Sequence, residues 1–219
     1  MKADDLAPAL RGFGPIGLLA LGAIYLGNAL FIPLSALLVL VWAWRSRTPW
    51  RELGLARPAS WAAAIVGGVL FGVGLKLVMK AVVLPLLGAP ATNGAFQFLV
   101  GNTAALPAML FMVIVGAGFG EEVLFRGFLF ERLGKLFGPR RGTPLAIVLL
   151  TAIWFGLEHY SLQGVPGVQQ ATLFGLVWGA IRARTGSIWM LAVAHAAFDV
   201  TAVAIIYWDL ETTVAHWVF

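Results

Sequence analysis

Long apolar segments alternate with short charged loops along almost the whole chain. A helix needs about 20 consecutive apolar residues to cross the hydrocarbon core of a bilayer. By that measure the pattern predicts six crossings, near residues 14–42, 60–86, 104–126, 143–160, 167–183 and 187–208. The predicted fold class is therefore all-α, a polytopic bundle of transmembrane helices.

The first apolar run has two readings. It is long, and it contains Asn28 and Pro33 in its interior. One tilted and kinked helix would fit it, and so would two shorter helices that form a hairpin. The predicted number of crossings is accordingly six to seven.

Composition excludes most other classes of protein. Hydrophobic residues make up 60% of the 219 residues and charged residues 11%, and the mean hydropathy is +0.90. Soluble domains have about 25% charged residues, so we expect residues 1–219 to form a single integral-membrane domain. The chain contains no cysteine, which excludes disulfides, iron–sulfur clusters and thiol nucleophiles. It has no Lys/Arg tract with interleaved aromatic residues, so nucleic acid is not an expected partner despite the net charge of +5.

The charges sort by loop. If every segment from residue 60 onward crosses once, the basic loops 45–57, 127–142 and 182–186 share one side, and the uncharged loops 88–103 and 161–166 share the other. The positive-inside rule places the basic loops in the cytoplasm. We therefore expect a multi-pass protein of a bacterial-type plasma membrane, with the N-terminus also cytoplasmic if the first run is a hairpin.

Three ionisable residues lie within the apolar segment 118–130. Glu122 and Arg126 are four residues apart, so they share a helix face and can form an ion pair. Glu121 has no partner in its own segment, and a carboxylate in that setting is a candidate general base. The alternative is an interfacial ion pair that simply ends the helix, because ionisable residues are common at membrane boundaries.

Histidines mark two further apolar segments. His159 follows Glu158 at the end of a run that begins at Thr143, and His195 and Asp199 are four residues apart within the last run. The alternatives are an interfacial histidine at 159 and a mutually neutralising pair at 195 and 199. His216 lacks such a setting and is interpreted as a surface residue.

The three motifs occur in a fixed order: Glu-Glu-x-x-x-Arg at 121–126, Phe-x-x-x-His at 155–159 and His-x-x-x-Asp at 195–199. In that order they resemble the CPBP family of intramembrane proteases, which includes CAAX prenyl endopeptidases and bacteriocin-processing or self-immunity proteins. The segments 50–55 and 185–187 are also similar to that family. The resemblance covers about residues 45–205.

The resemblance implies an intramembrane endopeptidase that hydrolyses a peptide bond of a membrane-associated protein or peptide. Glu121 would activate a water molecule with help from His159, and Glu122 and Arg126 would hold the site's geometry. His195 and the residue at 199 would stabilise the oxyanion.

The family often has Asn where this chain has Asp199, and an ionised Asp would repel an oxyanion. Asp199 is therefore either protonated or used to orient and charge His195, and we favour the second reading.

Two other questions stay open in the sequence. Two histidines and three acidic residues could bind zinc, but the His-Glu-x-x-His pattern is absent, and the mechanism implied by the resemblance requires no metal or other cofactor. The alternative to an enzyme is a non-catalytic membrane immunity or partner-binding protein, or a proton-coupled carrier.

Two geometric expectations complete the analysis. Lys76 and Lys80 share a helix face, and we expect them to extend to an interface, the alternative being that they bind a substrate carboxylate. His159 lies about 24 Å along its crossing and His195 only about 12 Å along its own, from the same side. A shared site therefore requires strong tilt, a deeply placed Glu pair, or a different helix boundary near 138–143.

Overall fold

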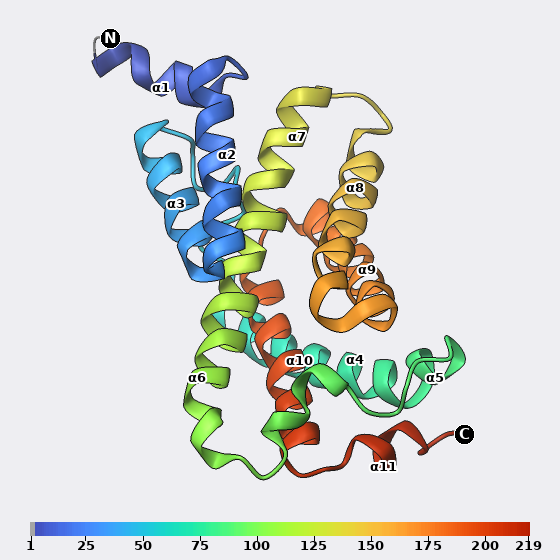
Figure 1. Cartoon of the computed structure of the whole chain (residues 1–219). Helices are drawn as coiled ribbons and strands as arrows, with labels where there is room; N and C mark the ends of the chain where they lie inside the picture. The colour runs from blue at the N-terminus through green and yellow to red at the C-terminus, as the bar shows by residue number, and fades with distance from the viewer. Residues whose placement is uncertain (1–2) are drawn as a thin grey trace.

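The computed structural model describes residues 3–219, and this part of the chain contains helices and no strands. The helices are α1 Ala3–Arg11, α2 Pro15–Leu30, α3 Ile32–Arg45, α4 Trp61–Val78, η1 Met79–Val83, α5 Leu84–Leu86, η2 Gly94–Leu99, η3 Thr103–Ala105, α6 Leu106–Phe111, η4 Met112–Phe128, α7 Leu129–Phe137, α8 Thr143–Glu158, α9 Tyr160–Thr185, α10 Trp189–Tyr207 and α11 Glu211–Ala215. The predicted all-α class is confirmed (Figure 1).

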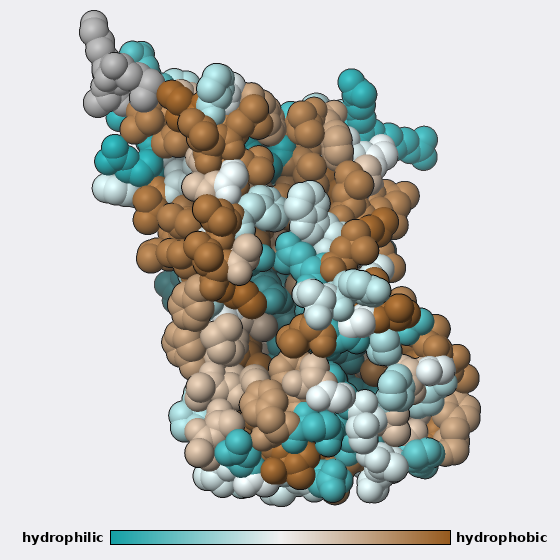
Figure 2. Space-filling model, viewed as in Figure 1, coloured by the Kyte–Doolittle hydropathy of each residue, from teal (hydrophilic) through white to brown (hydrophobic). Residues whose placement is uncertain are grey.

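Apolar side chains cover much of the outer surface, as Figure 2 shows for one face. Among the described residues, three continuous helical segments are long and apolar enough to cross a membrane: 61–86, 103–137 and 189–207. The pair α1 and α2, bent by 61°, would make a fourth, and α3 and α8 are shorter apolar helices. By length and composition, three or four of the predicted six to seven crossings are confirmed. The chain is an integral membrane protein.

The first apolar run is a helical hairpin. The chain leaves α2 at Phe31, which is extended (φ −165°), and Pro33 lies in the first turn of α3, where its missing N–H leaves no helical hydrogen bond unmade. The two helices lie side by side (Figure 1). The Trp42 indole donates a hydrogen bond to the Leu10 carbonyl over 3.1 Å, which holds the end of α3 against α1.

Small residues allow α10 to pack closely between two other helices. A Cβ atom on Gly72 of α4 would lie 2.1 Å from the Ala194 carbonyl oxygen, and one on Gly118 of η4 would lie 2.7 Å from the Ala196 Cβ. Close backbone approach through small residues is the usual way in which membrane helices pack. It places α10 against α4 and η4, with His195 buried among them.

The three basic loops meet at one end of the bundle. The Arg182 guanidinium donates to the Arg126 carbonyl over 2.8 Å and to the Glu52 carbonyl over 3.0 Å. The Glu52 carboxylate pairs with Lys135 at 3.3 Å and with Arg11 at 3.6 Å. The basic loops and α1 therefore lie on the same side, whereas which side faces the cytoplasm stays a prediction.

The depth of His159 follows from the length of the helix before α8. The helix η4–α7 continues to Phe137, ten residues beyond Gly127, which lies at the level of Leu53. Ten residues add about 15 Å to the helix. At the end of the bundle where the basic loops meet, α8 therefore starts further out than α10 does (Figure 1). The 16-residue α8 then returns as far as the middle of α10. α8 begins at Thr143, as predicted, so the boundary near 138–143 is not what differs; the extension of the preceding helix to Phe137 brings His159 close to the level of His195.

Candidate active site

Glu122 is the buried anchor of the site. One of its carboxylate oxygens accepts hydrogen bonds from Arg126 Nη1 over 3.0 Å and from His195 Nδ1 over 2.8 Å. The Arg126 guanidinium also lies over the ring of Phe155 in α8, 4.6 Å from its centroid. Glu122 and Arg126 therefore form the pair predicted from their spacing, and together they join η4, α8 and α10.

His195 presents its other nitrogen to two carboxylates. Nε2 lies 3.7 Å from Glu121 Oε2 and 3.5 Å from Asp199 Oδ2. The carboxylate that orients the imidazole through Nδ1 is thus Glu122, not Asp199 as we expected from the sequence.

Glu121 contributes a further buried carboxylate to this arrangement. Glu121 is only 8% exposed, and within the described residues its Oε2 has no hydrogen-bond partner. A buried polar atom without a partner costs about 1–3 kcal/mol. This oxygen is therefore available to a donor from outside the protein, such as water.

His159 directly follows α8 and is partly buried. Its Nδ1 contacts the Phe155 carbonyl oxygen at 2.8 Å, and because a carbonyl only accepts, Nδ1 carries the proton. Its Nε2 therefore has a free lone pair when the ring is neutral. Glu158 does not orient this ring, since its carboxylate accepts from Trp154 and Asn28.

A cavity of about 1020 Å³ brings these groups together. Glu121, His159, His195 and Asp199 all line it, while Glu122 and Arg126 lie behind its wall. Aromatic rings of Phe155, Phe174 and Phe198 form part of its apolar surface. Figure 2 shows hydrophilic residues in a hollow between apolar flanks. The structure thus gathers all six predicted site residues around one space.

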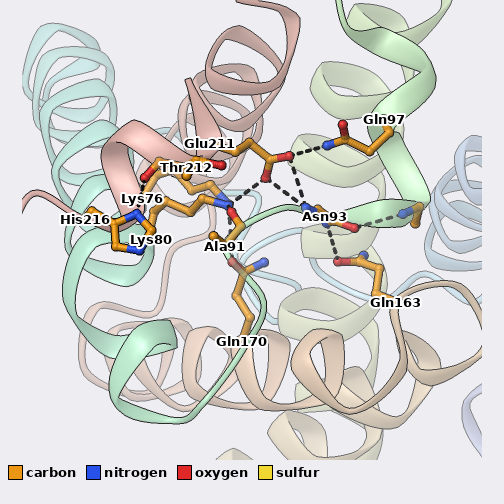
Figure 3. Close-up of polar contacts among 11 residues, drawn as sticks. Lys76, Lys80, Ala91, Asn93, Gln97, Gln163, Gln170, Glu211, Thr212 and His216 are labelled. Atoms are coloured by element: carbon orange, nitrogen blue, oxygen red, sulfur yellow. Dashed lines mark hydrogen bonds and ion pairs between the residues drawn. The ribbon is translucent and has the colours of Figure 1, made fainter. Parts of the chain in front are cut away.

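Two lysines in this region differ from their sequence interpretation. Lys76 and Lys80 are buried, so the expectation that they extend to an interface is wrong. Lys80 pairs with Glu211 at 2.6 Å, and Lys76 donates to Gln170 over 3.2 Å (Figure 3). Their shared helix face was the available signal, but their partners come from distant helices.

Arg182 is a further residue that the sequence did not single out. Its bonds to the carbonyls of Arg126 and Glu52 cover the site at the basic end. The segment 50–55, noted for its family resemblance, therefore helps to close that end. An arginine at the end of an apolar helix was the only sign in the sequence.

The described residues contain no group of three or more His, Cys, Asp or Glu side chains placed to hold a metal ion. Within the described residues, three carboxylates contact His195: Glu122 at Nδ1, and Glu121 and Asp199 at Nε2.

Comparison with known proteins gives two matches. Residues 103–201 match the family described as type II CAAX prenyl endopeptidase Rce1-like. A stretch of 98 residues is 34% identical to the uncharacterized protein YyaK of Bacillus subtilis (strain 168) and covers 42% of this chain and 31% of that protein. The chain thus matches less than a third of its relative's length. No solved structure matches the chain.

The family match includes Glu121, His159 and His195 with their motifs. Over residues 103–201, which are less than half of the chain, this protein is thus similar to the Rce1-like family of type II CAAX prenyl endopeptidases, in line with the resemblance indicated by the order of its motifs.

Proposed function

We propose that the protein is an intramembrane endopeptidase that hydrolyses a peptide bond with water activated by Glu121. The observation that carries this proposal is the buried Oε2 of Glu121, which has no hydrogen-bond partner in the described protein and lies 3.7 Å from His195 Nε2 at the cavity. A general base must lie within reach of the proton that it removes.

The first half of the reaction forms a tetrahedral intermediate. Glu121 accepts a proton from water, and the water oxygen bonds to the scissile carbonyl carbon while the carbonyl electrons move to its oxygen. His195 donates from Nε2 to that oxyanion when both of its nitrogens are protonated. Three carboxylates surround this ring: Glu122 lies at Nδ1, and Glu121 and Asp199 lie near Nε2.

The second half breaks the carbon–nitrogen bond. The proton held by Glu121 passes to the leaving nitrogen, and His159, whose Nε2 has a free lone pair in the neutral ring, assists the proton transfers. The products are a new carboxyl group and a new amine, which together contain the atoms of one water. No metal ion takes part in this sequence.

The substrate class follows from the site's surroundings. The cavity opens among apolar helices and is lined by aromatic rings, so we propose a membrane-associated peptide or protein as substrate. His195 is six residues into α10, about 9 Å from the end where the basic loops meet. Cleavage would thus take place near the cytoplasmic face of a plasma membrane, provided that the basic loops face inward.

Substitution of Glu121 tests the proposal. The wild-type protein and Glu121→Gln are reconstituted in vesicles and incubated with a panel of hydrophobic peptides, half of them farnesylated with a C-terminal CAAX sequence. Gln cannot accept the proton from water, so we expect the cleavage rate to fall by at least about 100-fold, in the range of general-base effects. Mass spectrometry of the products measures the rate and the cleaved bond.

Thermal unfolding of both forms in the same vesicles is the control for folding. Cleavage of the same bond by Glu121→Gln at the wild-type rate would contradict the mechanism. Failure of the folded wild type to cut any peptide in the panel would contradict the proposed activity.

A further inference from the structure

Hydrolysis consumes one water molecule for every bond that is cut, and Glu121 lies inside a bundle of apolar helices. The hydrocarbon core of a bilayer contains no water to supply it. The water must therefore reach Glu121 through the cavity, and the walls of the cavity differ in whether they allow this.

The cavity is closed at the end where the basic loops meet. None of the described residues in those three loops lines it. Leu53 and Ile188 are completely buried at this end, and a Cβ atom on Gly127 would lie 3.1 Å from the Leu53 carbonyl oxygen. The Arg182 guanidinium is bonded to two backbone carbonyls at the same level. Close packing thus leaves no passage for water there.

The side of the cavity is formed by apolar helices. Its exposed lining residues there include Ala29 of α2, Trp154 of α8 and Leu162 of α9. Glu158 is on the same side, but its carboxylate accepts from Asn28 and Trp154, which ties α8 to α2. This side suits a membrane-associated substrate rather than water.

The end opposite the basic loops is polar and reaches the surface. Pro90 and Thr92 are exposed there and line the cavity. Polar side chains from segments far apart in the chain form the wall behind them: Lys76, Lys80, Asn93, Gln163, Gln170 and Glu211 (Figure 3).

Hydrogen bonds join the outer part of this wall. The Glu211 carboxylate of α11 accepts from Lys80 Nζ over 2.6 Å and from the Asn93 backbone N–H over 3.1 Å. The Asn93 side chain donates to Gln163 of α9 over 3.4 Å (Figure 3). Three helical segments and the loop before η2 thus present polar groups at the mouth of the cavity.

The inner part of the wall continues to the reacting groups. Gln170 lies about two turns beyond Gln163 along α9 and accepts from Lys76 Nζ over 3.2 Å. Lys76 Nζ is 4.8 Å from the centroid of the Phe198 ring, and Phe198 precedes Asp199, which contacts His195. The polar wall therefore extends from the surface to the imidazole beside Glu121.

This wall can hold water. The Lys76 ammonium has three N–H donors, and within the described residues one of them is used, by Gln170. Buried N–H groups are normally satisfied by protein atoms or by ordered water. At about 30 Å³ for each water molecule, the cavity of about 1020 Å³ has room for many of them.

We propose that water reaches Glu121 from the end of the bundle opposite the basic loops, along the wall that runs from Glu211 and Gln163 to Gln170. This inference rests on the proposed endopeptidase activity, because the water that Glu121 activates must be replaced after each turnover. It separates the entry of water from the apolar side that suits the substrate.

Cysteine labelling tests this path, because the chain contains no cysteine of its own. Gln170→Cys and Asp199→Cys each place one thiol on the path, whereas Gln169→Cys places one on a neighbouring residue that does not line the cavity. Intact and opened cells are treated with a small, positively charged methanethiosulfonate that does not cross membranes. Mass spectrometry measures the labelled fraction over time.

Asn102→Cys and Arg140→Cys mark the two sides of the membrane. We expect both cysteines on the path to react from the side on which Asn102→Cys reacts, at least about tenfold faster than Gln169→Cys. The thiolate is the reactive form, and apolar surroundings that raise the pKa of a thiol by one unit lower the thiolate fraction about tenfold.

Thermal unfolding of each variant is the control for folding. The two cysteines on the path are in different helices, α9 and α10, so either one tests the path if the other variant does not fold. Reaction only from the side of Arg140→Cys, or reaction no faster than that of Gln169→Cys, would overturn the inference. Labelling does not require cleavage, so failure of the proposed function appears separately, as the absence of Glu121-dependent cleavage.

Discussion

Glu122 supports the site from behind the cavity, because a single carboxylate oxygen accepts from both Arg126 and His195. Removing its charge leaves the Arg126 guanidinium buried without its partner, and breaking a buried ion pair costs about 3–5 kcal/mol. We expect Glu122→Gln to lower both the unfolding temperature and kcat. Thermal unfolding and peptide cleavage in the same vesicles measure the two effects.

Asp199→Asn is the matched comparison for Glu122→Gln. Asp199 contacts the same imidazole but through Nε2, and its side chain is 25% exposed. An Asn amide can donate to the oxyanion, so we expect kcat/KM to stay within about tenfold of wild type, less than the roughly 100- to 1000-fold loss of a full oxyanion donor. A loss as large as that of Glu122→Gln would show that the negative charge of Asp199 is essential.

Sequence patterns predict contacts within a helix better than contacts between helices. The four-residue spacing correctly predicted the Glu122–Arg126 pair, because both residues lie on one face of η4. It could not predict that Glu122 would bind His195, which is 73 residues away. The burial of Lys76 was missed for the same reason, since Gln170 comes from another element.

At the scale of helices, glycines of α4 differ in what surrounds them. A Cβ on Gly72 would lie 2.1 Å from the Ala194 carbonyl oxygen, whereas one on Gly74 would have no heavy atom within 4 Å. Gly72→Ala should therefore separate α4 from α10 and destabilise the fold by about 1–3 kcal/mol, as overpacking does. Thermal unfolding of both variants measures the difference.

Gly74→Ala is the control, and we expect it to be neutral or to stabilise the helix by up to about 1 kcal/mol. Equal unfolding temperatures for the two variants would show that α4 and α10 are not in close contact at Gly72.

The boundary of the central helix shows where a hydropathy pattern is insufficient. The apolar run indicates an end near residue 126, but the helix continues through α7 to Phe137. Glu131 and Arg132 are buried in this extension, and Glu131 pairs with Arg132 and Lys135. Charged residues satisfied by one another can thus extend a helix beyond the limits that hydrophobicity predicts.

At the scale of the molecule, the order of apolar segments predicted the helical class and the shared side of the basic loops. It left the first run undecided, because a hairpin and a kinked helix have the same composition. The contact between Trp42 and Leu10, 32 residues apart, distinguishes the two, since it returns the chain to the level of its N-terminal helix.

The orientation in the membrane can be measured directly because the chain contains no cysteine. Single cysteines at the exposed positions Gly14, Arg140 and Asn102 can be labelled in intact cells with a maleimide that does not cross membranes. The positive-inside rule predicts that Arg140→Cys is protected until the cells are opened. The hairpin predicts the same for Gly14→Cys, while Asn102→Cys, at the opposite end of the long helix from Arg140, should react at once. Labelling of Gly14→Cys together with Asn102→Cys would contradict the hairpin in the membrane, and labelling of Arg140→Cys in intact cells would reverse the orientation and with it the face at which cleavage is expected.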